Sequence, residues 1–129
     1  MTNELVELIP GLVSGSDLSN KANLYHVVKL SAANTVALAG AVSDMLLGVL
    51  VNCPAAGEAA AVAGPGSIVG CVAGGLVSAG DYITTNANGQ GVKANPAAAA
   101  NNNVVGIALT GASSGACFTL LVLPQRIQG

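Results

Sequence analysis

Residues 48–57 read GVLVNCPAAG, and residues 106–115 read GIALTGASSG. Each stretch begins with a glycine-led apolar run, continues through a turn that ends in glycine, and is followed by another apolar run. Short apolar runs bounded by turn residues are typical of buried β-strands. Upstream, Tyr25 and Tyr82 stand at nearly the same distance from the two stretches. We therefore predict an internal repeat, in which two similar β-meanders pack face to face.

Further strand candidates occur along the chain on both sides of the two stretches. The candidates are residues 25–30, 35–38, 46–51, 58–63, 67–72, 81–85, 91–94, 104–109 and 116–123. Asn88-Gly89 predicts a tight hairpin, and Pro124 is expected to end the last strand. The alanine-rich residues 96–100 are expected to form a loop or one helical turn, closed by residues 101–103. Short strands separated by turns predict an all-β fold, a small antiparallel sandwich or barrel.

The first 23 residues differ from the rest, so we divide the chain into an N-terminal arm, residues 1–23, and a β-rich domain, residues 24–129. Pro10 and Gly11 would stop a helix early in this segment. Its apolar side chains either pack on their own domain or dock on a neighbouring subunit, for example by adding a strand to a sheet edge. The candidate partner-binding residues are Leu5, Val6, Leu8, Ile9 and Leu12.

The chain of 129 residues has few charges: 8% of its residues are charged, against about 25% in an ordinary domain. Such a chain usually hides much of its surface against copies of itself or a partner, so we expect an oligomer or an assembly component. Its four basic residues are scattered, which disfavours nucleic acid as a partner. No apolar run approaches the ~20 residues that span a bilayer, and no export signal is visible, so we expect no membrane partner.

Groups suited to catalysis are few, and we expect no enzyme, no metal and no cofactor. The single histidine, His26, is expected to be a half-exposed strand residue rather than a general base. Glu58 and Asp81 each follow an Ala-Gly pair, where a carboxylate commonly accepts hydrogen bonds from turn N–H groups. The three cysteines show no metal-ligand spacing. We expect them to be buried thiols rather than a disulfide or a reactive site.

Several turn motifs together resemble those of tailed-phage capsid decoration (cement) proteins, a family often described only as a conserved phage domain of unknown function. The similar stretches are YHVVKL at residues 25–30, GVLVNCPAAGEA at 48–59, VAGG at 72–75, AGDYITTNANG at 79–89 and VGIAL at 105–109. The resemblance extends over about residues 24–123. The family implies a β-rich protein on the outside of the virion head, assembled in the host cytoplasm.

The resemblance also implies partners. A decoration protein binds the major capsid protein and stabilises contacts between adjacent capsid subunits, and it commonly associates as a trimer, although dimers occur. We therefore expect a structural protein of the virion, with the trimer favoured. Two alternatives stay open at this point. One is another virion β-module, such as a head-fibre base or a tail component. The other is a non-viral binding module or an enzyme.

Overall fold

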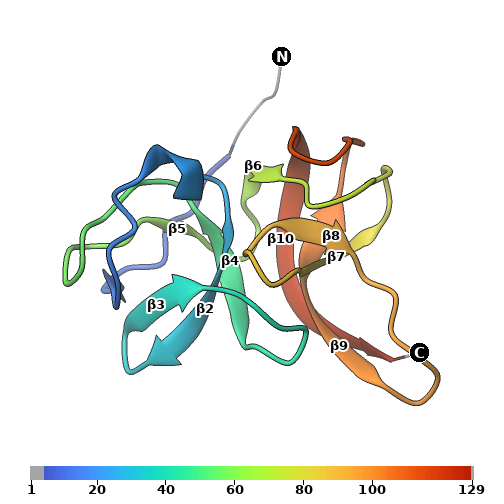
Figure 1. Cartoon of the computed structure of the whole chain (residues 1–129), viewed down its shortest axis with the longest axis horizontal. Coiled ribbons are helices and arrows are strands. Elements are labelled where there is room, and N and C mark those ends of the chain that lie inside the picture. The colour runs from blue at the N-terminus through green and yellow to red at the C-terminus, as the bar shows by residue number, and fades with distance from the viewer. Residues whose placement is uncertain (1–4, 129) are drawn as a thin grey trace.

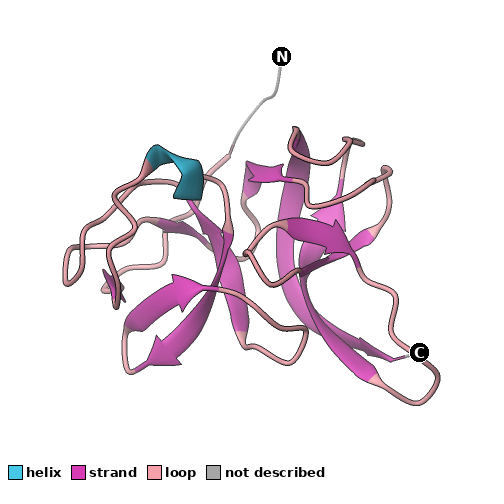
Figure 2. Ribbon diagram, in the orientation of Figure 1, coloured by secondary structure: helices cyan, strands magenta, loops and turns pink. Residues whose placement is uncertain are grey.

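The computed structural model describes residues 5–128 and confirms an all-β fold (Figures 1 and 2). Its strands form two five-stranded sheets, and the helical structure among the described residues is one 3-10 turn, η1 (Lys21–Asn23). The strands are β1 (Val13–Ser14), β2 (Val27–Ala32), β3 (Thr35–Leu38), β4 (Leu46–Leu50), β5 (Val62–Ala63), β6 (Ile68–Val72), β7 (Tyr82–Thr85), β8 (Gly91–Lys93), β9 (Asn101–Ala108) and β10 (Cys117–Gln128).

The two sheets divide the chain into a first lobe, β1–β5, and a second lobe, β6–β10, which lie side by side in Figure 1. The strand order in the first lobe is β1-β3-β2-β4-β5, and in the second it is β6-β10-β9-β7-β8. Each lobe contains an antiparallel hairpin, β2-β3 or β7-β8, whose first strand also pairs on its other side with β4 or β9, so the strand order is not that of a meander. One more antiparallel strand, β5 or β10, then pairs with β4 or β9. The lobes therefore have the same topology.

Additional β-bridges connect the edge strands of each sheet, so that each sheet is nearly closed into a barrel. In the first lobe, β1 pairs in parallel with β3 through Ser14 and Val36, and Val13 also bridges Ala59, just before β5. In the second lobe, Ala73 pairs in parallel with Gly91 of β8, directly after β6 has paired with β10. In both lobes, therefore, the first strand or the residue after it pairs in parallel with the third strand, β3 or β8, and the first strand also contacts the last strand, β10, or the residues just before β5.

Equivalent backbone hydrogen bonds confirm the internal repeat. The Leu50 N–H donates to the His26 carbonyl at 2.9 Å, at the end of β4. The Ala108 N–H donates to the Asp81 carbonyl at 2.9 Å, at the end of β9. The two predicted glycine turns also match, because Gly57 and Gly115 both have a positive φ, 80° and 86°. The repeat predicted from residues 48–57 and 106–115 thus has the same backbone in both lobes.

The leading glycine of each stretch is required by the close approach of the next strand. A Cβ at Gly48 would overlap the carbonyl oxygen of Ala63 in β5. A Cβ at Gly106 would overlap the carbonyl oxygen of Leu121 in β10. Since any other residue would force backbone against backbone, the shared glycine reflects the same strand packing in both lobes.

The tyrosine alignment that accompanied the predicted repeat is wrong by two residues. The Ala39 N–H donates to the Val27 carbonyl, and the Ala94 N–H donates to the Tyr82 carbonyl. Tyr82 therefore occupies the position of Val27 in the repeat, whereas Tyr25 lies two residues earlier. The loop before the leading glycine differs in length: Gly48 follows Leu38 by ten positions, whereas Gly106 follows the matching Lys93 by thirteen, and this shifts the count.

Each lobe fills its interior with side chains from matching positions. In the first lobe these side chains form a separate buried cluster, partly closed by Ile9, Leu38 and Leu47. In the second lobe six of the seven counterparts lie in the larger cluster that reaches the other lobe. The matched positions, first lobe before second, are Leu12 and Cys71, Leu18 and Val77, Val28 and Ile83, Val36 and Gly91, Leu50 and Ala108, Ala60 and Phe118, and Val62 and Leu120.

Two strand predictions need correction near the C-terminus. Pro124 does not end the last strand: β10 continues to Gln128, with a register shift between Val122 and Gln125 that accommodates the proline. Residues 101–103 do not close a loop but begin β9, because they pair with the end of β10. The extension was hidden in the sequence because polar asparagines give no strand signal, and the pairing partner lies far along the chain.

The described part of the predicted N-terminal arm is built into the fold. Leu5 pairs with Ile68 of β6 through two hydrogen bonds, 3.1 and 2.7 Å long. The Gly64 N–H donates to the Glu7 carbonyl at 2.8 Å, so the segment runs antiparallel to the connection between the two lobes. Further along, β1 and the buried Leu18 belong to the first lobe.

Candidate functional site

The N-terminal segment presents apolar side chains on the surface while its backbone is paired. Leu5 is 59% exposed, Leu8 is 55% exposed and Val6 is 39% exposed. The backbone of this segment bonds to residues of both β5 and β6. Three of the five predicted partner-binding residues therefore lie on a segment that isolated β-bridges hold to the rest of the chain.

The other two predicted residues lie elsewhere. Ile9 is half-buried, and its Cγ1 lies so close to Gly64 that a Cβ there would be 2.6 Å away. Leu12 is only 7% exposed and belongs to the interior cluster of the first lobe. Leu12 therefore stabilises the fold, and the accessible part of the predicted surface consists of Leu5, Val6 and Leu8.

Exposed apolar side chains also occur well beyond the N-terminal segment, at positions that the sequence pattern did not predict to be exposed. Large side chains of this kind are Val13, Leu30, Val42, Met45, Leu76, Tyr82, Leu109 and Leu123. Leu76 is the most exposed, at 78%. Three of them, Tyr82, Leu109 and Leu123, lie on or next to strands of the second lobe. Strand alternation gives a signal for them, since each is flanked by a buried residue.

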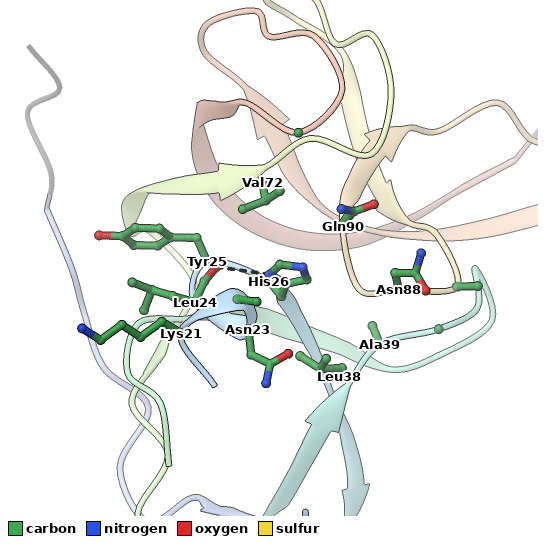
Figure 3. A pocket seen from close by; sticks show the side chains of 14 residues that line it. Lys21, Asn23, Leu24, Tyr25, His26, Leu38, Ala39, Val72, Asn88 and Gln90 are labelled. Carbon is green, nitrogen blue, oxygen red and sulfur yellow. Dashed lines mark hydrogen bonds between the residues drawn. The ribbon is translucent and has the colours of Figure 1, made fainter. Parts of the chain in front are cut away.

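A cleft of about 840 Å³ lies at the junction of the two lobes (Figure 3). The first lobe contributes η1, Tyr25, His26 and the end of β3, while the second contributes Val72 and the β7–β8 turn. The ionisable side chains among the residues that line it are those of Lys21, Tyr25 and His26. The lining contains no carboxylate that could work with His26 as an acid–base pair.

The sequence expectation for His26 was wrong about its exposure. His26 is only 8% exposed and lies just before β2, not within it. Its Nδ1 is 3.1 Å from the carbonyl oxygen of Leu24, a contact drawn as the dashed line in Figure 3. Burial follows from the junction, because the turn after β7 packs over this end of β2: the Val27 N–H donates to the Gly89 carbonyl at 2.7 Å.

The carboxylates hold turns, as the sequence predicted. Glu58 accepts a hydrogen bond of 2.7 Å from the Ala55 N–H, and Asp81 accepts one of 2.9 Å from the Ser78 N–H. Asp44 accepts from the N–H groups of residues 40 and 41 and lies 3.6 Å from the Lys29 ammonium. Burial alone would raise the pKa of Asp44, but these hydrogen bonds and the Lys29 charge outweigh it and lower the pKa.

The three cysteines are free thiols in three different environments. Cys71 is buried in the second lobe, and burial raises its pKa to about 12. Cys53 is half-buried, and Cys117 is exposed, so the expectation of three buried thiols is wrong for Cys117. Cys117 is exposed because it begins β10 at an outward-facing position, opposite Val72. Residues 5–128 bring together no group of three His, Cys, Asp or Glu side chains able to hold a metal ion.

Comparison with known proteins identifies no family. No protein-family model matches the chain, and no curated protein matches it. Within residues 5–128 no helix has the length and hydropathy needed to cross a membrane. The main feature of the described surface is its exposed apolar side chains rather than a cluster of reactive groups.

Proposed function

We propose that this chain is a structural protein of a virion, which binds the outer surface of a phage capsid and stabilises contacts between adjacent major capsid subunits. The observation that carries the proposal is the balance of its surface. Among the described residues, eleven large apolar side chains are exposed, whereas the whole chain has only ten charged ones. An apolar surface of this extent favours permanent contact with other protein subunits.

The N-terminal segment is the part of this surface that we assign to the capsid. Leu5, Val6 and Leu8 lie on one short segment, which isolated β-bridges and backbone hydrogen bonds tie to β5 and β6. A fixed segment loses little conformational entropy on binding, so its side chains can contribute more of their contact energy. On a capsid, many identical weak contacts occur at once, and moderate affinity for each subunit is enough for a stable shell.

A rigid body suits this role. Two hydrogen-bonded lobes joined by a shared cluster resist deformation, so a strain that separates two capsid subunits is transmitted through the chain. The carboxylates of Glu58 and Asp81 accept hydrogen bonds from backbone N–H groups of their own turns, and a structural role requires no other task of them. It requires no reaction at the junction cleft.

The experiment compares particles of a phage that encodes this chain with particles from which the gene has been deleted. We expect electron microscopy to show density for the chain repeated over the head of the normal particle. Particles without the gene should release DNA at a lower temperature. Density confined to the tail or to a head fibre would favour the other virion module, and density nowhere on the particle would overturn the proposal.

Point variants test the assigned surface. Leu5→Lys with Leu8→Lys should weaken capsid occupancy by about 100-fold, because two apolar contacts become buried charges. The matched control is Leu76→Lys with Met45→Lys, which changes two apolar residues elsewhere on the chain that are at least as exposed. Added variant protein is titrated against particles that lack the gene. Equal occupancy for both double variants and the unchanged chain would exclude the N-terminal segment as the capsid contact.

A further inference from the structure

An apolar row crosses the outer face of the second lobe. Tyr82 in β7 pairs with Ile107 in β9, and Ile107 pairs on its other side with Leu121 in β10. Leu109, which directly follows the last residue of β9, lies two residues beyond Ile107 and so on the same side of the chain. Tyr82 and Leu109 are each 43% exposed, and Ile107 and Leu121 are half-buried. We call these four residues the outer row; none of them is charged.

The same row exists in the first lobe, and there the chain covers it. The counterparts of Tyr82, Ile107, Leu109 and Leu121 are Val27, Val49, Val51 and Ala63. Val27, Val49 and Ala63 are fully buried in the cluster that contains the core of the second lobe, and Val51 packs against that cluster. A position that the fold covers in one repeat is therefore left uncovered in the other.

The covering residues come from the end of the second lobe's barrel. Val69 in β6 and Val105 in β9 are fully buried in the shared cluster, together with Val122 in β10. β4 contacts both β9 and β10, which places the row of the first lobe against this end. At the junction, the outer face of the first lobe packs on the end of the second lobe's barrel. Because these are two different surfaces of the repeat, the lobes are joined head-to-tail rather than by a two-fold axis.

The barrel end also has an uncovered counterpart, in the first lobe. Ile9 occupies the position of Val69, because Leu8 pairs with Ala63 as Ile68 pairs with Leu121. Leu47, next to Gly48, occupies the position of Val105, next to Gly106. Ile9 and Leu47 are both only half-buried. The chain therefore contains one complete junction and, on its outside, both halves of a second.

From this repeat we infer that the chain associates with copies of itself head-to-tail. The outer row of one copy packs on Ile9 and Leu47 at the end of the first lobe of the next copy. The contact repeats between chains the packing that joins the two lobes within a chain. A head-to-tail contact closes into a ring when its rotation allows, and otherwise forms a chain of subunits. The inference concerns the purified protein and does not depend on the capsid proposal.

Sedimentation equilibrium of the full chain tests the outer row. The unchanged protein should form oligomers whose mass rises with concentration or reaches a fixed multiple of the monomer. Tyr82→Lys with Leu109→Lys should weaken association by at least about 100-fold, because each lysine would bury a charge in the contact. The control, Leu76→Lys with Met45→Lys, should associate as the unchanged protein does. Thermal unfolding establishes that each variant is folded.

A mixing experiment tests the head-to-tail geometry. Leu47→Lys blocks the receiving end but leaves the outer row intact, whereas the Tyr82 and Leu109 variant does the reverse. Each should be monomeric alone, and an equal mixture should give a dimer and nothing larger. A monomeric unchanged chain, or association that the outer-row variant leaves intact, overturns the inference. So does a mixture that stays monomeric; if Leu47→Lys does not fold, Ile9→Lys takes its place.

Discussion

The first and second lobes share a hydrogen-bonded framework but fill it with different side chains. Inside the first lobe, Val36 and Ala60 belong to the same buried cluster, a larger residue and a smaller one. At the matching positions of the second lobe, Gly91 lies beside Phe118. A Cβ at Gly91 would lie 2.9 Å from the Cys71 sulfur and 3.0 Å from both the Ile83 side chain and the Phe118 ring, so Phe118 is one of three side chains that leave room there only for glycine. Volume is conserved in the pair while each member changes.

The difference teaches that the backbone of this repeat is more constrained than its core. Each lobe keeps the glycine that lets β5 or β10 approach, and the glycine turn that follows it. The interior side chains differ in size between the lobes, provided that their total volume fills the interior. The outer faces differ most, because the first lobe buries its row and the second exposes it.

The largest expected effect comes from exchanging the interior pair. Phe118→Ala should lower the free energy of unfolding by about 3–5 kcal/mol, because the second lobe loses its largest buried side chain. Adding Gly91→Val would recreate the Val36 and Ala60 pair of the first lobe and should recover about 1–2 kcal/mol. Urea unfolding of the two single variants and the double variant measures the coupling. Additive losses would show that the pair does not compensate.

A slightly smaller effect is expected at the shared glycines. Gly48→Ala and Gly106→Ala should each cost about 3 kcal/mol, because the new Cβ would press on a backbone carbonyl in the neighbouring strand. Gly75→Ala is the matched control: a Cβ there has no atom within 4 Å, and its cost should stay within about 0.5 kcal/mol. Thermal unfolding measures all three. Clearly unequal losses of unfolding free energy in the two variants would show that the two glycines are not equivalent.

The smallest effect concerns a carboxylate found in one lobe alone. Asp44 holds the β3–β4 loop, whereas the β8–β9 loop of the second lobe, residues 94–100, contains no acidic residue. Because the pKa of folded Asp44 lies below its ordinary value of 3.8, its stabilisation is present above about pH 4. It is lost as the pH falls through the lower pKa of the folded chain.

Asp44→Asn should therefore lose at most about 1 kcal/mol at pH 7 and much less at pH 2. Urea unfolding of both proteins at the two pH values measures the difference. Lys93→Gln, which changes a charged residue of the second lobe that makes no ion pair among the described residues, serves as the control. An equal loss for Asp44→Asn at both pH values would assign its effect to packing rather than to charge.

The sequence predicted much of the fold. Short apolar runs and glycine turns located β3 at its observed bounds and most other strands within a few residues. The sequence was less informative about which apolar side chains are exposed on the surface. Leu5, Leu8 and Leu12 look alike in the sequence, yet Leu12 fills a core and the other two are exposed. Which side of a strand faces the interior depends on its partner, and β1 finds that partner in β3.

By itself, the sequence determined the all-β class and the repeat, because glycine spacing and apolar runs are local and both lobes express them in the same way. The tertiary structure alone decided how the two repeats join. The end of the second lobe's barrel covers Val27, Val49 and Ala63, the residues of the first lobe that match the outer row. Tyr82 and Leu109, in the outer row itself, stay exposed. Nothing local distinguishes the two rows, since both are apolar. Only the packing of one repeat on the other determines which row lies inside and which is available to another subunit.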